Sequence, residues 1–469
     1  MSYFSGGKTA AISAGAIFAA LVGQAQAQEA DVNASVSFGV RYYTEDGLYP
    51  EQSDAGAEGA FEFNINGAKP IGPGQLNFDI DGLADITGTR NVLNPAELNY
   101  TQSFGNWSVL AGFHTENWGV AESRSVMNVM NPTNNADPMI EDVLLGTPMV
   151  NLNYTSSIGT FSAYALTGFI EPIYAEGDDA RFRSPLEWDS SRAEFEASKR
   201  DRNLDLALRY AGYFSVGAGS LDIQATYFNG TSREAVGLPG CVGSFGTVTE
   251  AICNQANVLI QQAYEAGLDL DLDGLDFDVS NIEDILDQID PDLADDLVAL
   301  LSTEPVLGAV PYYQKVEQIG LSTVYALNDL QLRFEASVHE TSTGGYFSGM
   351  VGGDYTFNGF FAGKGDLTVA AEYLYDDRSP VQPLTIFEND VFLGFNYKFN
   401  NANATELKMG VFHDIDSKAR LYTMGVSSRL TDETSIEFNA THVDTQGYND
   451  PLAFIGNDSF MELKFTSYF

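Results

Sequence analysis

Residues 330–339 read LQLRFEASVH, and apolar and polar side chains alternate through the whole stretch. Leu330, Leu332, Phe334, Ala336 and Val338 share one parity, and Gln331, Arg333, Glu335, Ser337 and His339 share the other. Because successive side chains of a β-strand point to opposite faces, the stretch predicts a strand with one apolar and one polar face. The same alternation recurs in residues 32–42, 366–375 and 390–399.

Two architectures produce such two-faced strands. In a soluble sandwich the apolar faces meet in a core, whereas in a transmembrane barrel they face lipid and the polar faces line a wet interior. The alternating stretches are long for a sandwich, whose strands usually have about 5–6 residues. They match the length of a tilted strand that crosses a bilayer. Aromatic pairs at stretch ends, such as Tyr42–Tyr43 and Tyr227–Phe228, are typical of the girdles of a barrel.

The connections favour the barrel. Short turns alternate with long loops along the chain, as they do in outer-membrane barrels, where the short turns are periplasmic and the long loops extracellular. Both termini then lie on the periplasmic side, which requires an even number of strands. We therefore predict an all-β, transmembrane, antiparallel up-and-down β-barrel of about 18 strands. The segment 346–357 is the weakest strand, so about 16 strands is the alternative.

The N-terminus carries a targeting pattern. Lys8 is the only charge before a small, apolar run over residues 9–22, and Ala25-Gln26-Ala27 has the A-x-A form of a cleavage site. This predicts a signal peptide over 1–27 and a mature barrel over 28–469; an N-terminal anchor helix is the alternative, although the run falls short of the roughly 20 residues that span a bilayer. For an exported chain we expect a disulfide between Cys241 and Cys253, with a free, reactive pair as the alternative.

The last residues, 457–469, read NDSFMELKFTSYF and alternate up to a final aromatic. This segment resembles the C-terminal strand of Gram-negative outer-membrane barrels, which ends in Phe and is read by the barrel-assembly machinery. The resemblance implies the outer membrane of a Gram-negative bacterium as the location. It implies the assembly machinery, outer-membrane lipids and lipopolysaccharide as partners. Nucleic acid is excluded as a partner, because the net charge of −42 opposes phosphate binding.

A barrel of this size is too wide for its own side chains to fill and leaves an aqueous channel unless it is plugged. The predicted pore-lining residues are the charged and imidazole side chains on polar parities: Arg41, Arg209, Arg333, Glu335, His339, Glu372, Lys398, Glu406, Lys408, Arg429 and Glu437. On the polar faces as a whole acids outnumber bases, so we expect a weak preference for cations. The alternative for any one of these residues is a solvated ion pair on the wall.

The connection over residues 114–147 is expected to fold into the lumen. Its apolar side chains would form too large a patch to remain in water. We predict that Trp118, Met127, Met130, Asn131 and Pro132 form a constriction there. The alternative is that they only pack the loop against the inner wall and contact no cargo.

The stretch 95–186 contains a recognisable sequence of motifs, namely Gly112, Trp118-Gly119, Val129 and Asn131-Pro132. It resembles a family of poorly characterised, porin-like Gram-negative outer-membrane β-barrels with a WG…NP loop motif. That family is often linked to the handling of hydrophobic compounds. The resemblance implies a channel that passes small or lipophilic solutes across the outer membrane.

The segment 231–313 is predicted to be a large acidic extracellular loop with helical content. Between Glu234 and Gln314 there are 16 acids and no Lys or Arg. A surface-exposed binding or adhesion protein that acts through this loop is therefore the alternative function. Asp269, Asp271, Asp273, Asp276 and Asp278 surround Gly274 and begin like an EF-hand, but Ser280 stands where the template requires Glu. A weak extracellular Ca²⁺ site and a solvated acidic stretch are both left open.

No catalytic motif emerges from the chain. Only four His are present, and the sequence contains no G-x-S-x-G, H-E-x-x-H or P-loop pattern. We therefore predict that the protein is not an enzyme, and we expect no cofactor other than the Ca²⁺ left open above. Large porins are often trimers, so a homotrimer is also left open.

Overall fold

The structure, a computed structural model, describes residues 31–136, 143–183, 188–241, 257, 261, 307–379, 381–445 and 450–469. The predicted signal peptide, Cys253 and the five aspartates of 269–278 lie outside these residues. The disulfide and the Ca²⁺ segment therefore stay predictions. Of the acidic segment 231–313, the described part consists mainly of the two strands that flank it.

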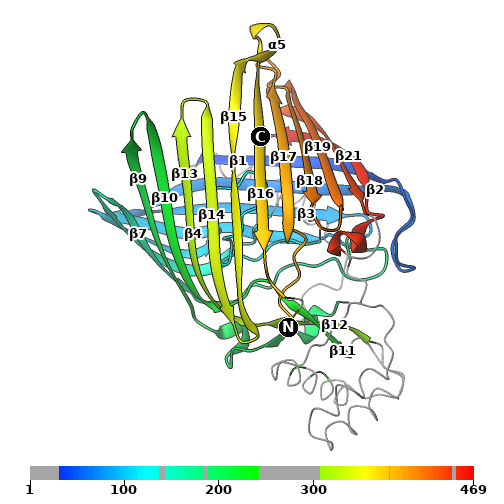
Figure 1. Ribbon diagram of the computed structural model, residues 1–469, viewed down its shortest axis with the longest axis horizontal. Coiled ribbons are helices and arrows are strands. Elements are labelled where there is room, and N and C mark those ends of the chain that lie inside the picture. The colour runs from blue at the N-terminus through cyan, green and yellow to red at the C-terminus, as the bar shows by residue number, and fades with distance from the viewer. Residues whose placement is uncertain are drawn as a thin grey trace, which may run out of the picture.

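The barrel is a single closed sheet of 18 strands (Figure 1). The strands are β1 (Asp31–Tyr43), β2 (Gly56–Ile71), β3 (Gly74–Asp85), β4 (Val92–Phe104), β5 (Trp107–His114), β6 (Thr147–Ser156), β7 (Gly159–Leu166), β9 (Asp205–Val216), β10 (Gly219–Thr231), β13 (Lys315–Leu327), β14 (Leu330–Thr341), β15 (Gly344–Gly359), β16 (Gly365–Asp376), β17 (Asn389–Lys398), β18 (Glu406–Asp414), β19 (Arg420–Thr431), β20 (Thr434–Asp444) and β21 (Phe460–Tyr468). Each pairs antiparallel with the next of these strands, and β21 pairs back onto β1 with Val40 opposite Leu463.

Closure leaves no edge strand whose backbone groups would be unpaired, a requirement for any sheet that lies in lipid. The prediction of 18 strands is confirmed, and the alternative of 16 is wrong. The weakest predicted strand, 346–357, is the central part of β15, which pairs along its length with both β14 and β16.

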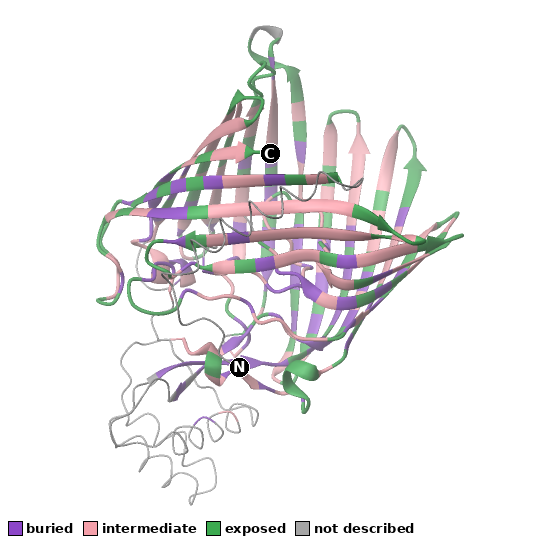
Figure 2. Cartoon of the chain, turned by 180° about the vertical axis from the view of Figure 1, so that it is seen from behind, coloured by how far each residue is buried: buried purple, intermediate pink, exposed green. Residues whose placement is uncertain are grey.

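The two faces of the strands are inverted relative to a soluble protein. On β14, Leu332, Phe334 and Val338 are 40–56% exposed on the outside, whereas Glu335 and Ser337 are at most 1% exposed on the inside. Figure 2 shows the resulting alternation of exposed and buried residues along the strands. An apolar exterior over a polar interior is the distribution expected of a barrel whose outer solvent is a bilayer. Exposed aromatic side chains occur near both strand ends, for example Tyr42 and Tyr375 at one end and Trp107 and Phe357 at the other.

The short turns gather at one end of the barrel and the long connections at the other (Figure 1). Three of the tight turns need a residue with positive φ, and Gly105, Gly217 and Asn328 take this conformation with φ of 60°, 61° and 52°. The short helix α5 (Phe360–Gly363) caps the β15–β16 turn. β1 begins and β21 ends at the turn end, so the chain enters and leaves the barrel on the same side.

A second, three-stranded sheet lies at the loop end in the order β11 (Val236–Cys241), β12 (Leu307–Tyr313), β8 (Glu194–Phe195). The 3₁₀ turns η2 (Ser190–Arg192), η3 (Arg200–Arg202) and η4 (Pro451–Ile455) also belong to the long connections. Within the described part of the chain, no helix has the length and apolar character needed to cross a membrane.

Candidate functional site

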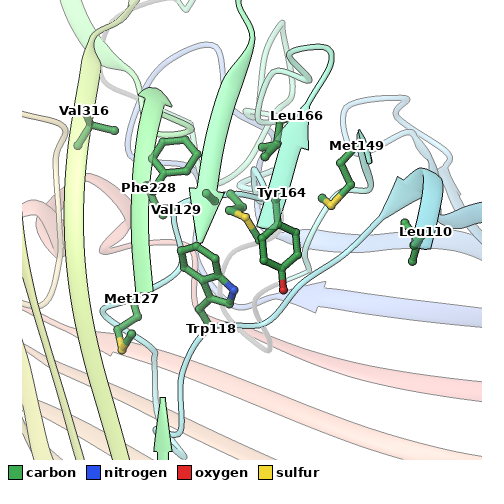
Figure 3. Packing of buried hydrophobic residues seen from close by; sticks show 11 residues of the cluster. Leu110, Trp118, Met127, Val129, Met149, Tyr164, Leu166, Phe228 and Val316 are labelled. Atoms are coloured by element: carbon green, nitrogen blue, oxygen red, sulfur yellow. The ribbon is translucent and has the colours of Figure 1, made fainter. Parts of the chain in front are cut away.

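The described part of the connection between β5 and β6, residues 115–136 and 143–146, turns into the barrel, and we call it the first inward loop. Trp118, Met127 and Met130 are at most 1% exposed and belong to one apolar cluster with residues of the wall (Figure 3). The Trp118 ring meets the Tyr164 ring of β7 edge-on, with centroids 6.1 Å apart. The cluster also includes Phe228 of β10 and Val316 of β13. The loop is therefore packed along the inner wall by hydrophobic contact.

The far part of this loop is held by one buried carboxylate, Glu335 of β14. Its Oε1 accepts hydrogen bonds from the backbone N–H groups of Val120 and Ala121, the second at 2.7 Å. Its Oε2 accepts from Val126 N at 3.0 Å and from the Ser125 hydroxyl at 2.9 Å. An unpaired carboxylate at this depth would be strongly disfavoured, so the four donors and the carboxylate stabilise one another.

A second carboxylate holds the same segment two strands further round the barrel. Glu372 of β16 accepts from the backbone N–H of Glu122 at 2.8 Å and of Ser123 at 2.9 Å, and also from the Ser123 hydroxyl. Arg333 of β14 joins the Glu122 side chain to the wall and pairs with Asp354 Oδ2 at 2.9 Å. Hydrogen bonds from its backbone N–H groups to two carboxylates therefore fix the position of segment 120–126 more precisely than apolar packing alone would.

The order of strands shows how far this loop reaches. Counting round the sheet from β5, β14 is the sixth strand and β16 the eighth of 18. The loop thus leaves the wall at β5 and is held nearly half-way round the ring. Its described residues cover the inner wall from β7 to β16 and narrow the barrel on that side.

Asn131 closes the base of the first inward loop. Its Nδ2 group donates to three oxygens, His114 O at 3.0 Å, Leu145 O at 2.9 Å and Thr147 Oγ1 at 3.3 Å, and its Oδ1 accepts from Glu116 N at 2.9 Å. The neighbouring carbonyl of Pro132 accepts from Leu145 N at 2.8 Å. Both Asn131 and Pro132 are buried, so they tie the two ends of the loop together and do not face an open channel.

Three ionisable residues, His114, Glu116 and Arg209, lie together at the start of the loop. Glu116 accepts from Arg209 Nη1 at 2.6 Å and from the Tyr164 hydroxyl at 3.1 Å, and it lies 3.4 Å from His114 Nε2. Burial alone would raise the pKa of Glu116, but the hydrogen bond from His114 and the charge of Arg209 hold it below its usual value. Glu116 is therefore charged at neutral pH and pairs with Arg209 of β9.

The described part of the connection between β7 and β9, residues 167–183 and 188–204, runs the other way across the loop end of the barrel, and we call it the second inward loop. Arg181 is held by Asp458 Oδ1 at 2.8 Å, by Asn457 O at 2.7 Å and by further backbone carbonyls, and its guanidinium lies 4.4 Å from the centre of the Tyr43 ring. Phe182 packs in the cluster that contains Tyr43 and Phe460. This loop therefore leaves the wall at β7 and is anchored at β1 and β21, six and seven strands away.

Arg233, just after β10, joins the two inward loops. Its guanidinium donates to Met130 O at 3.2 Å in the first loop and to Asp205 Oδ2 at 2.9 Å on the wall. It also lies 4.6 Å from the centre of the Phe169 ring in the second loop. The loops meet again where Asn135 N donates to Ile173 O at 2.7 Å. The two loops and the wall thus form one hydrogen-bonded unit.

The eleven predicted pore-lining residues all lie on the strand parity opposite to the exposed apolar rows, but they divide by burial. Arg41, Glu335, His339 and Glu372 are buried. Arg41 lies with its Nε 3.3 Å from Glu462 Oε1, and the His339 ring stacks on Tyr346 with centroids 4.2 Å apart. The remaining seven are half-buried or exposed: Arg209, Arg333, Lys398, Glu406, Lys408, Arg429 and Glu437.

Charge is distributed unequally round the inner wall. Glu62, Asp79, Asp81 and Glu97 lie on β2, β3 and β4, and all four are half-buried. The bases Lys398, Lys408 and Arg429 lie on β17, β18 and β19 and are exposed. These two groups occupy separate arcs of the ring, so a solute between them experiences a field directed from one arc to the other.

No protein-family model and no curated protein matches the chain. Solved structures that match include a mutant of Rh. blastica porin, with 15% identity, a TM-score of 0.39 and coverage of 94% of this chain and 100% of that chain. Pseudomonas aeruginosa OccK5 (OpdH) matches with 9% identity, a TM-score of 0.44 and coverage of 93% and 98%. The fold assignment rests on the strand pairing itself, and these likenesses carry no argument about function.

Several residues that organise this site escaped sequence reasoning. Glu335 and Glu372 appeared as two more wall charges, because alternation places a side chain on a face but does not reveal what covers it. Arg181, Asp458 and Arg233 lie in long connections without periodicity, where a buried charge leaves no local signal. The second inward loop is one of the long connections, which as a class were expected to be extracellular.

Proposed function

We propose that the protein is a passive channel of the outer membrane that admits small polar solutes through a path narrowed by the two inward loops. The observation that carries the proposal is the clamp of backbone N–H groups on Glu335 and Glu372, six and eight strands from the origin of the loop. A loop fixed in this way sets the width of an otherwise wide barrel, as a size filter requires.

The charges support a weak preference for cations. The acidic arc on β2–β4 is not matched by an equal number of bases there. Fixed charges near a narrow path concentrate ions of the opposite sign. The proposal of a lipophilic cargo, which rests on family resemblance, finds no support in Trp118, Met127 and Met130, because their apolar surface is used in packing against the wall.

Planar-bilayer recordings with purified protein test both parts of the proposal. We expect single-channel conductance steps. Under a KCl gradient we expect a reversal potential whose sign shows that K⁺ is more permeant than Cl⁻. Asp79→Asn combined with Asp81→Asn should move the reversal potential toward zero. The matched pair Lys398→Gln and Lys408→Gln should move it the other way. A protein that inserts without conducting would contradict the channel, whereas conduction with an anion-selective potential would overturn only the charge argument.

A further inference from the structure

Three carboxylates meet at the loop end of β17 and β18, away from the clamp. Glu388, Asp390 and Asp414 each offer one oxygen, and these oxygens all lie within 4.8 Å of one another. Asp390 and Asp414 stand directly opposite each other in the β17–β18 register, on the inward face of both strands. Like charges that face each other across a strand pair destabilise the sheet, so this arrangement needs a compensating positive charge.

Asp390 supplies the independent observation that points to a ligand. It is 1% exposed, and neither of its carboxylate oxygens has a hydrogen-bond partner among the described residues. Buried carboxylates are normally hydrogen-bonded, paired or bound to a metal. Within the described chain, none of the three carboxylates pairs with a Lys or Arg at 4.0 Å or less. By contrast, the nearby Asp376 is paired with Arg378 at 2.9 Å.

We propose that Glu388, Asp390 and Asp414 form a binding site for one Ca²⁺ ion at the loop end of the barrel. Hard divalent cations take oxygen ligands, and carboxylates are the usual protein donors. At a Ca²⁺–oxygen distance of about 2.4 Å, the ligand oxygens of one ion lie up to about 4.8 Å apart, and the three carboxylate oxygens fall within that limit. A set of three anionic oxygen donors suits the flexible coordination of Ca²⁺, with water completing the coordination.

The backbone round the site is already fixed. Asp376 N donates to Glu388 O and Ile415 N donates to Asn389 O, both at 2.9 Å. Asp414 Oδ1 accepts from Ser417 N, which leaves its other oxygen for the ion. Glu388 is half-buried, so the ion has access from solvent on that side. A bound ion would tie the connection before β17 to the β18–β19 hairpin.

Ca²⁺ titration of the EDTA-treated, full-length protein by calorimetry, together with its unfolding midpoint in EDTA and in CaCl₂, tests the site. We expect Asp390→Asn to weaken this binding by at least about tenfold, because even outer-shell changes weaken metal sites by 10–100-fold. In EDTA the unfolding midpoint of Asp390→Asn should be higher than that of the wild type, because the substitution relieves the repulsion between the carboxylates. In CaCl₂ it should be lower than that of the wild type, because the variant lacks the stabilisation by the bound ion. This inversion is not expected of a pair that merely shares protons.

Asp444→Asn is the matched control, since Asp444 lies at the same end and faces Arg420 at 3.5 Å. It should leave Ca²⁺ binding unchanged. The double variant Asp271→Asn and Asp273→Asn distinguishes Ca²⁺ bound by the acidic segment from Ca²⁺ bound at Asp390. Asp390→Asn should show the same inversion of unfolding midpoints in this background. Unchanged Ca²⁺ affinity in both Asp390→Asn and Asp414→Asn, or the same order of midpoints with and without Ca²⁺, would overturn the proposal.

Discussion

Asn131 illustrates how one amide determines the path of a whole loop. Three of its contacts are donated by Nδ2 to oxygens, and its Oδ1 accepts one backbone N–H. Only a side chain with both a donor and an acceptor at this position satisfies all four groups. The Asn of the Asn-Pro motif is thus explained by hydrogen bonding at the base of the first inward loop.

Asn131→Asp tests this role with almost no change of shape. The new carboxylate keeps the acceptor but places a charged oxygen against three oxygens, so we expect a loss of about 2–4 kcal/mol in the free energy of unfolding. Urea unfolding of the protein in detergent, followed by Trp fluorescence, measures the change. Asn33→Asp, at an exposed position, is the control and should change stability by about 0.5 kcal/mol or less. Equal effects of the two substitutions would contradict the assignment.

Arg181 allows a second prediction at this scale. Its replacement by Met removes the partner of the buried Asp458 carboxylate, which typically costs about 3–5 kcal/mol. Arg200→Met removes a pair in which the Arg is half exposed, and it should cost less than about 1 kcal/mol. The same unfolding assay compares them. Adding Asp458→Asn to Arg181→Met should recover part of the loss, and no recovery would mean that Arg181 acts by packing alone.

At the scale of elements, the second inward loop carries an ionisable group that makes its packing depend on pH. Burial raises the pKa of Glu171 to about 7, and the negative charges of Glu176 and Asp201 contribute in the same direction. The folded state therefore holds a proton that the unfolded chain releases at its ordinary pKa of 4.5. The resulting stability is present below that value and is lost as pH rises toward about 7.

We expect the urea midpoint of the wild type to decrease as the pH is raised from about 5 to about 8. In Glu171→Gln this decrease should be smaller. The substitution keeps the shape of the neutral side chain, so the two proteins should have similar stability at the acidic end. Urea midpoints across the pH range provide the measurement. If Glu171→Gln keeps the full slope of the wild type, the pH dependence belongs to other groups.

The elements also show where sequence reasoning stops. Alternation such as that of residues 330–339 is sufficient to predict the strands, because it depends only on neighbours along the chain. The positions of the inward loops depend on contacts such as Val120 with Glu335, which are 215 residues apart. No local pattern encodes those contacts, so the first loop was expected in the lumen only on hydrophobic grounds, and the carboxylate clamp went unrecognised.

At the scale of the whole molecule, the closed sheet is the part most fully predicted from sequence. Its strand number follows from alternation, turn chemistry and the need for an even count, and all three are properties of the chain. The proposed function follows less directly. In the proposed channel the loops inside the ring provide the selectivity, and their packing is visible only in three dimensions.

We propose that the clamp on Glu335 and Glu372 holds the first inward loop across the path of solutes. Single-channel conductance of Glu335→Gln combined with Glu372→Gln tests it most directly, with Glu406→Gln as the matched control. Each Gln presents an N–H₂ group to backbone donors, so the loop should be released. We predict a larger and noisier conductance than in the wild type or the control. A folded double variant whose conductance equals that of the wild type would contradict the account.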